Sequence, residues 1–386
     1  MRAVVTSGSA GARSVHGHTS PTGLCARPLA AGVLDPSMVL PLLDIRAFHS
    51  NPQRFAEELR HACHHYGFFQ IRHGMPGSVV SRATALSREF FALPEEAKRR
   101  IDYTNSSAFR GYMANGVENT AGKPDLREQV EIAPEAPPAA SDAWPPFHRL
   151  CGRNQWPDEA LPELRPAIEE YAQCVGEVAR EITEALCLAL RLERDALSHF
   201  FEPEPHWQLK LAQYSPAQRA DASSPPAPDV GVGAHTDSGW LTLLLQDGSG
   251  GLQAFTRGEW TDVPPAGDDV FVCNLGEVAE MLSAGYLLAT PHRVLLPATP
   301  RMSIPYFFNP RLDSKVAPIE LPPSLPWERE EGYEKRTHWR RPDNAMIKEY
   351  GSNAFKSLAR SHPAVFATHH PDLAVLEDGR VVKREI

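Results

Sequence analysis

The sequence lacks three features that would each point to a particular class of protein. No run of 18 apolar residues occurs in the 386-residue chain, so no segment is predicted to cross a membrane as a helix. The six cysteines are scattered and form no CxxC pair, which excludes a dense disulfide framework and fits reduced thiols in the cytoplasm. Basic residues are not in excess, since 39 Lys and Arg face 48 Asp and Glu, and the net charge of −9 argues against a nucleic-acid partner.

Acidic residues are also missing from the start of the chain, where Asp35 is the first. Residues 1–37 are rich in Ser, Gly, Ala and Arg and show no apolar periodicity. Three interpretations remain open: a disordered tail, a transit segment for organellar import, or an upstream start with Met38 as the true beginning. The transit interpretation has the least support, because only three arginines precede Asp35.

Hydrophobic periodicity predicts several helices in the first half of the chain and one near its end. Asn51-Pro52 marks a helix start, and apolar residues at helical spacing continue to Tyr66. The same spacing predicts helices over about 79–91, 166–192 and 344–360. Short strands are expected at 40–45 and 68–71.

Strand signals dominate after residue 205. Eight short apolar segments alternate with turns, at 207–214, 231–237, 241–246, 251–255, 259–263, 269–274, 286–296 and 302–308. This spacing is typical of a sandwich or barrel, so we predict a double-stranded β-helix (jelly-roll) core with flanking helices, in the α+β or mainly β class. The predicted regions after the tail are 38–150, a helical segment at 151–204, the core at 205–310 and a helical extension at 311–386.

A histidine and an aspartate stand two positions apart in GAHTDSGWLTLLL, just before an apolar run. Residues i and i+2 of a strand point to the same side, so His235 and Asp237 can share one partner. An unpaired polar group there costs roughly 2 kcal/mol or more, which leaves a structural hydrogen bond, a proton-transfer role or a metal ion. A second such pair, His370 and Asp372, has no further polar partner downstream and is expected to be structural.

Two downstream features favour a metal at the first pair. His292 lies in another apolar segment, 55 residues after Asp237, and a strand there can bring it to the same point across the sandwich. Arg301 and Ser303 also share one side of a strand, and an arginine inside an apolar barrel needs an anion such as a carboxylate. Two histidines and one carboxylate leave three positions open on a metal, as in non-haem Fe(II) oxygenases.

With these motifs the chain resembles the isopenicillin N synthase-like family of Fe(II)- and 2-oxoglutarate-dependent dioxygenases over about residues 39–365. The first half matches the family's N-terminal region in order, through LPLLDI, HHYGFFQIRHGMP, EFFALPEEAK and FRGYM. The second half follows the family order through LKLAQYSP, GAHTDSGWLTLLLQD, GLQAF, GEWTDVPP, VCNLGEVAEMLSAGY, ATPHRV and RMSIPYFF. Each piece is weak alone, but the combined match is highly specific.

The resemblance implies a role for each matched residue. The residues that resemble the iron ligands are His235, Asp237 and His292. The residues that resemble contacts to the cosubstrate 2-oxoglutarate are Arg301 and Ser303, for its distal carboxylate, and Tyr214.

Other positions match or depart from the family pattern. Asn274 and Gly276 match its NxG turn, for which we expect a structural role. Ala212 stands where many relatives have asparagine, which puts one cosubstrate contact in doubt, while Glu277 for the usual aspartate is expected to be neutral. Pro305 lacks a backbone donor and implies an edge or a bulge in its strand.

The resemblance implies an enzyme that uses Fe(II), 2-oxoglutarate and O2, and that couples decarboxylation of 2-oxoglutarate to hydroxylation, desaturation or cyclisation of a small organic substrate. Alternatives within the family are ethylene formation from 2-oxoglutarate itself and an oxidase that needs no 2-oxoglutarate. From other classes, a non-catalytic jelly-roll binding module and a zinc hydrolase remain open.

The substrate pocket is the least determined part of the prediction. Candidate substrate contacts are Arg110, Tyr112, Arg127 and Phe308. If Arg110 or Arg127 faces the pocket, an acidic or amino-acid-like substrate is favoured, and the competing interpretation for Arg110 is a surface ion pair. We expect a small-molecule substrate, no nucleic-acid or membrane partner, and a monomer or weak homo-oligomer.

Overall fold

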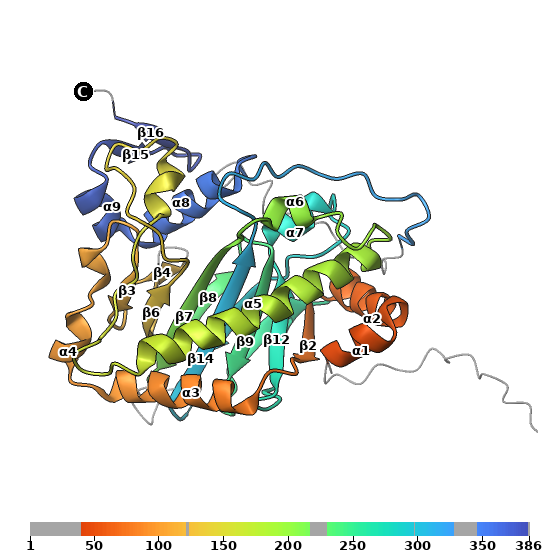
Figure 1. Cartoon of the computed structure of the whole chain (residues 1–386), viewed down its shortest axis with the longest axis horizontal. Coiled ribbons are helices and arrows are strands. Elements are labelled where there is room, and N and C mark those ends of the chain that lie inside the picture. The colour runs from red at the N-terminus through yellow and green to blue at the C-terminus, as the bar shows by residue number, and fades with distance from the viewer. Residues whose placement is uncertain (1–39, 121–122, 217–229, 297, 328–345, 385–386) are drawn as a thin grey trace, which may run out of the picture. The chain divides into compact units, whose positions relative to one another are not determined.

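The computed structural model describes residues 40–120, 123–216, 230–296, 298–327 and 346–384. The expected tail at 1–37 lies outside the described residues. In the described part, a sheet of eight strands and a sheet of four strands form the core, and helices flank the larger sheet (Figure 1).

The larger sheet has the strand order β1-β2-β12-β9-β14-β7-β6-β3. In that order its strands are β1 (Leu42–Asp44), β2 (Phe68–Arg72), β12 (Val270–Leu275), β9 (Leu241–Gln246), β14 (Arg301–Asn309), β7 (His206–Tyr214), β6 (Glu128–Ile132) and β3 (Gly111–Met113). Strands β1 and β2 pair parallel, and the other described neighbours pair antiparallel.

The smaller sheet has the order β11-β10-β13-β8. Its strands are β11 (Glu259–Asp262), β10 (Leu252–Thr256), β13 (His292–Leu295) and β8 (Val230–His235). Apolar side chains from the two sheets form one buried cluster, in which Ala212 and Val272 of the larger sheet pack with Val232 and Val294 of the smaller. The two sheets therefore face each other, as the predicted jelly-roll core requires.

Helices cover the outer face of the larger sheet. Helix α5 (Leu164–Ala189) crosses β7, β14, β9 and β12 in Figure 1. Its buried side chains recur at helical spacing, among them Ile168, Val175 and Ile182. The other helices are α1 (Ile45–Ser50), α2 (Pro52–His65), α3 (Gly77–Ala92), α4 (Glu95–Arg99), α6 (Ser198–Phe201), α7 (Glu277–Leu282), α8 (Tyr350–Ser361) and α9 (Pro363–His369).

Two short 3-10 helices, Tyr103–Asn105 and Pro146–Leu150, and two small hairpins complete the described elements. The pair β4 (Asn119–Thr120) and β5 (Lys123–Pro124) lies before β6 in the chain. The pair β15 (Leu373–Val375) and β16 (Val381–Lys383) follows α9, and in Figure 1 it lies close to α8 and α9.

Most predicted elements are confirmed, with two corrections. The segment 286–296 is a strand only at His292–Leu295, because 286–291 is a buried turn and loop leading into it. The expectation of an edge strand at Pro305 is wrong, since β14 lies between β9 and β7. The register between β14 and β7 is the same at Ser303 and at Tyr306, so the strand contains no bulge there. The pairing with β7 is interrupted between these two residues, which accommodates a proline without a backbone donor.

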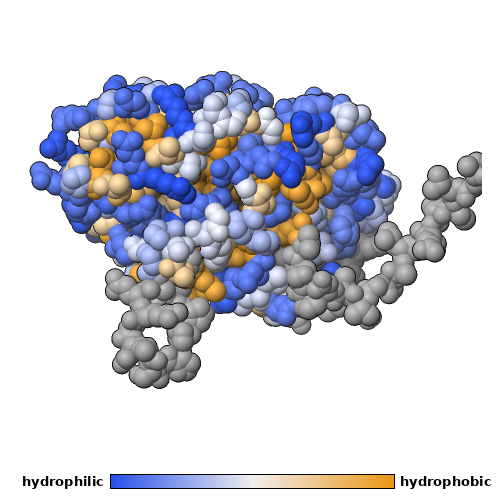
Figure 2. Space-filling model, turned by 90° about the horizontal axis from the view of Figure 1, so that it is seen from below, coloured by the Kyte–Doolittle hydropathy of each residue, from blue (hydrophilic) through white to orange (hydrophobic). Residues whose placement is uncertain are grey.

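The surface mixes both kinds of residue in the view of Figure 2, where hydrophobic residues lie among hydrophilic ones. The large apolar side chains that are exposed are well separated in sequence: Leu42, Trp144, Val230, Trp327 and Leu376. Among the described residues, no helix has the length and apolar character that crossing a bilayer requires.

Candidate metal and cosubstrate site

Three side chains meet at the ends of two neighbouring strands of the smaller sheet, so His292 approaches from the same sheet and not across the sandwich as expected. His235 ends β8 and His292 begins β13, and the two are direct Cα partners in the register of these strands. Asp237 follows His235 by two residues, and its Oδ1 lies 3.7 Å from the Nε2 atom of each histidine. One ligand atom from each of the three residues falls within 4.8 Å of the others. The spacing suits one metal ion held by all three.

Hydrogen bonds orient both imidazoles toward that point. The Nδ1 of His235 lies 2.8 Å from the carbonyl oxygen of Gly233, and the Nδ1 of His292 lies 3.1 Å from that of Thr290. A carbonyl only accepts, so each Nδ1 carries the proton and each Nε2 keeps its lone pair.

The carboxylate is fixed in the same way. Asp237 Oδ2 accepts hydrogen bonds from Thr242 Oγ1 at 2.5 Å and from Asn274 Nδ2 at 2.7 Å, which leaves Oδ1 for a metal. Gly276 keeps the chain close at this point, because a Cβ there would lie 2.2 Å from the carbonyl oxygen of Gly239.

The protonation states also suit a metal. Burial, with the neighbouring His292, lowers the pKa of His235 to about 4. Burial raises the pKa of Asp237, but the two histidines and the hydrogen bonds from Thr242 and Asn274 outweigh it and hold that pKa below the usual value. At neutral pH His235 is therefore neutral and Asp237 is ionised, as metal binding requires.

A buried arginine lies deeper in the sandwich. Arg301 begins β14, is 1 % exposed, and stacks its guanidinium 4.8 Å from the centre of the Tyr214 ring. It donates to Ser303 Oγ at 3.1 Å and to Gln246 Oε1 at 3.1 Å. Among the described residues no carboxylate forms an ion pair with it, and its Nε has no hydrogen-bond partner. A buried cation without a counter-ion favours an anionic ligand at this point.

Arg127 is the predicted substrate residue that the structure brings to the metal end. It lines a pocket of about 630 Å³ together with His235 and Asp237. Its guanidinium is already shared, because it donates to Glu118 and Asp125 and, through Nη1, to the hydroxyl of Tyr214 at 3.2 Å.

The other predicted substrate residues lie elsewhere and are not retained. Arg110 is buried and donates to the carbonyl oxygens of Ala108 and Leu150 and to Asn154. The Tyr112 hydroxyl lies within hydrogen-bond distance of two carboxylates, 3.1 Å from Glu95 and 2.9 Å from Glu128. Phe308 stacks on Phe201 in the core, while its neighbour Phe307 lines the pocket, because adjacent strand residues face opposite sides.

The second His-Asp pair has protein partners at both residues. Asp372 accepts two hydrogen bonds from Arg149, at 2.8 and 2.7 Å. His370 lies 3.0 Å from the carbonyl oxygen of Ser107 through Nε2. Both contacts fit the structural role expected for this pair.

Three contributors to the site were not predicted from the sequence. Asn274 was assigned to a turn, yet it bonds the candidate metal ligand Asp237. Thr242 and Gln246 are the polar positions of LTLLLQ, four apart and so on one face of β9. This spacing in an otherwise apolar strand could have identified them, because it places the Thr242 hydroxyl and the Gln246 amide on the same face.

Two histidines and a carboxylate that could hold one metal ion lie in the same sandwich as a buried arginine with no carboxylate partner in the described residues, the kinds of residue expected of a non-haem oxygenase of the 2-oxoglutarate type. Comparison with known proteins leads to the same class. Residues 206–310 match the model of the 2OG-Fe(II) oxygenase superfamily, and residues 40–159 match the N-terminal region described as non-haem dioxygenase in morphine synthesis.

Individual relatives agree. The chain is 32% identical to the 2-oxoglutarate-dependent dioxygenase frbJ of Dothideomycetidae sp. (strain 11243), over 77% of this chain and 81% of that protein. It is 32% identical to the homoarginine-6-hydroxylase 2-ODD-C23 of Glycine max, over 68% of this chain and 80% of that protein. The crystal structure of a 2OG-Fe(II) oxygenase family protein from Caulobacter crescentus has a TM-score of 0.62 at 27% identity, over 72% of this chain and 90% of that one.

The chain therefore belongs to the isopenicillin N synthase-like group of the 2OG-Fe(II) oxygenase superfamily. It is an oxidoreductase that uses Fe(II), 2-oxoglutarate and O2 and acts on a small organic substrate. The relatives named as 2-oxoglutarate-dependent dioxygenases favour this function over the alternatives considered above.

Proposed function

We propose that His235, Asp237 and His292 hold the Fe(II) of this dioxygenase. The observation that carries the proposal is the convergence of their three ligand atoms within 4.8 Å, with the other polar atoms of all three side chains occupied by hydrogen bonds. When bound, iron supplies the decarboxylation of 2-oxoglutarate to succinate and the coupled oxidation of a substrate C–H bond.

We further propose that Arg301, Ser303 and Tyr214 bind the distal carboxylate of 2-oxoglutarate. Arg301 and Tyr214 are direct partners across β14 and β7, so their side chains share one face of the sheet. The guanidinium fork suits a carboxylate, and the Ser303 hydroxyl can add a hydrogen bond beside it. Gln246 supports this carboxylate site in two ways. Its Oε1 accepts a hydrogen bond from Arg301, and its Nε2 is a buried donor without a partner in the described part of the chain.

The chain's own residues then orient the reactants and exclude water. The two imidazoles and the Asp237 carboxylate would hold the metal that binds one end of the cosubstrate, and Arg301 would hold the other end. The pocket of about 630 Å³ beyond Asp237 is the proposed position of the small-molecule substrate. Because one of the relatives is a homoarginine-6-hydroxylase, amino-acid-type molecules are a reasonable first group to screen.

The first test is an anaerobic titration with Fe(II) and 2-oxoglutarate, followed through the visible metal-to-ligand charge-transfer band. We expect a band in the wild type, its loss in Asp237→Ala and a weaker cosubstrate affinity in Arg301→Ala. Arg46→Ala serves as a matched control, since this exposed arginine pairs with Asp44 on the surface. Bound iron without a band in the wild type would overturn the assignment of Arg301, Ser303 and Tyr214 to 2-oxoglutarate.

We also infer a cytoplasmic enzyme, monomeric or weakly self-associating, with no nucleic-acid partner. The net charge of −9 supports the last point, and the five cysteines of the described chain are unpaired. Sedimentation at several protein concentrations would test the state of association.

A further inference from the structure

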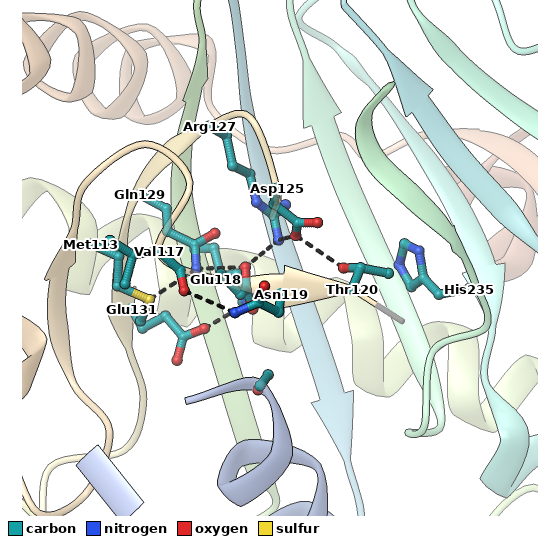
Figure 3. A network of polar contacts seen from close by, with 12 residues as sticks. Met113, Val117, Glu118, Asn119, Thr120, Asp125, Arg127, Gln129, Glu131 and His235 are labelled. Atoms are coloured by element: carbon teal, nitrogen blue, oxygen red, sulfur yellow. Dashed lines mark hydrogen bonds and ion pairs between the residues drawn. The ribbon is translucent and has the colours of Figure 1, made fainter. Parts of the chain in front are cut away.

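Part of the lining of the proposed substrate pocket is built from buried charges. We call Glu118, Asp125, Arg127, Glu131 and Lys210 the charged wall. Arg127 and Glu131 come from the β6 region and Lys210 from β7, and all except Asp125 line the pocket that also contains His235 and Asp237. Figure 3 shows Glu118 at the centre of this network, with Thr120 between Asp125 and His235.

Each cation of the charged wall is shared between two carboxylates. Arg127 donates to Glu118 Oε2 at 2.6 Å and to Asp125 Oδ2 at 3.3 Å. Lys210 lies 2.7 Å from Glu118 Oε1 and 2.6 Å from Glu131 Oε1. Gln129 gives Glu118 a further donor at 2.9 Å. Most donors of the wall are therefore directed at its own carboxylates; the exceptions are Arg127 Nη1, which donates to Tyr214, and Arg127 Nε, which is buried without a partner in the described residues.

Acceptors remain in excess. Three carboxylates face two cations. Among the described residues no hydrogen bond reaches Glu131, although its side chain is only 4 % exposed: Oε1 has the ion pair with Lys210 but no hydrogen-bond partner. His362 lies 3.8 Å from Oε1, which is too long for a hydrogen bond. A buried carboxylate with one unused oxygen at a pocket surface favours a ligand that donates hydrogen bonds and carries positive charge.

A second metal ion does not explain this cluster. Glu118, Glu131 and His362 have ligand atoms close enough to hold one. The ammonium of Lys210, however, forms ion pairs with both carboxylates and so occupies the position that a metal would need. An anionic substrate is also disfavoured, because it would have to displace carboxylates from Arg127 or Lys210. Arg360, which also lines the pocket, is exposed to solvent.

We propose that the substrate carries a cationic nitrogen group, an amine, amidine or guanidinium, that donates to Glu131. The inference rests on the proposed function, because it takes this pocket as the substrate site. Glu131 pairs with Lys210 across β6 and β7, and β14 separates β7 from the β9 strand that carries Thr242 beside Asp237. Three strand spacings amount to roughly 14 Å along the sheet, so the cationic group lies several bonds from the C–H that is oxidised.

The test compares a cationic probe with a neutral molecule of nearly the same shape. Protein loaded anaerobically with Fe(II) and 2-oxoglutarate is titrated with L-arginine and, separately, with L-citrulline, and the shift of the charge-transfer band gives both dissociation constants. L-Lysine against L-norleucine is a second pair, and L-glutamate is the anionic probe. We expect the cationic member of at least one pair to bind about 10-fold tighter or more, as for one hydrogen bond to a charged group.

Glu131→Gln keeps the shape of the side chain and removes its charge, so we expect it to abolish this preference. Glu135→Gln is the matched control, because Glu135 lies near the same strand but outside the pocket. Its carboxylate accepts a hydrogen bond from the backbone N–H of Asn154. The preference should survive there.

Each failure has a distinct meaning. No charge-transfer band would overturn the proposed function itself. A band that no cationic probe perturbs more than its neutral or anionic counterpart would overturn the substrate class alone. An unchanged preference in Glu131→Gln would remove Glu131 from recognition, and if this variant does not fold, the wild-type comparison still decides the substrate class.

Discussion

Replacing Asn274 by alanine tests whether the hydrogen bonds to Asp237 set the metal affinity. The Asn274 amide donates to Asp237 Oδ2 at 2.7 Å, and Thr242 donates to the same oxygen. Asp237 is 9 % exposed, so water does not readily replace a lost donor. Without Asn274 the carboxylate has one donor fewer to fix its orientation, and Oδ1 no longer points reliably between the two histidines.

The size of the effect follows from the bond that is lost. A hydrogen bond to a buried charged group contributes about 1.5–3 kcal/mol. Partners of metal ligands typically change metal affinity by roughly 10- to 100-fold, which matches that range. We therefore expect Fe(II) to bind about 10- to 100-fold more weakly in Asn274→Ala. Thr242→Val, which removes the hydroxyl and keeps the shape, should have a similar effect, and the double variant a larger one.

The assay is anaerobic competition for Fe(II) against a chromophoric chelator, with urea unfolding run in parallel. Asn353→Ala is the matched control, because this buried amide bonds the backbone of Ile347 and Glu349 and touches no metal ligand. It should lower stability and leave metal affinity unchanged. Wild-type Fe(II) affinity in a folded Asn274→Ala/Thr242→Val protein would refute the reasoning.

Three further predictions address other parts of the structure. Arg301→Lys keeps the charge but loses the fork, so the 2-oxoglutarate dissociation constant, measured by calorimetry on the metal-loaded protein, should rise roughly 10-fold or more; an unchanged value would exclude the bidentate contact. Gln246→Leu removes the Oε1 that holds Arg301, and we expect weaker 2-oxoglutarate binding with unchanged Fe(II) affinity; weaker metal binding would contradict a role confined to the cosubstrate. Burial, with a smaller effect of the Arg110 charge, lowers the pKa of His206 to about 3, so the unfolded chain takes up a proton below about pH 6.5 while the folded chain stays neutral. Stability is therefore lost as the pH falls from 6.5 toward 3, by about 2 kcal/mol at pH 5 from this residue, and His206→Phe should abolish that part of the loss in urea unfolding at pH 7 and pH 5.

The candidate site residues that lie on strands could be predicted from the sequence, because alternate residues of a strand point to the same side. That rule predicts a shared side for Arg301 and Ser303, and the structure brings them together in β14. It also predicts proximity of His235 and Asp237, which the structure shows although β8 ends at His235 and not at residue 237 as expected. His292 was harder, because it required β13 to lie beside β8, which depends on the order of strands in the smaller sheet. The resemblance to the family supplied that information.

The substrate pocket could not be predicted in the same way, because it depends on register and on hydrogen bonds between distant segments. Phe307 rather than Phe308 faces the pocket, a difference of one residue that only the register of β14 decides. Arg110 and Arg127 looked alike in the sequence. The fold directs the first to backbone carbonyls and the second to Glu118 and Tyr214.

The contacts of Arg127 in the structure change the substrate class that this residue indicates. The sequence predicts an acidic substrate if Arg127 faces the pocket, but in the structure its two Nη groups donate to two carboxylates and a phenol. Burial raises the pKa of Tyr214, yet the charges of Arg127 and Arg301 outweigh burial and lower it. Arg127 therefore links the cosubstrate end of the site to the charged wall, and the group left to meet the substrate is the carboxylate of Glu131.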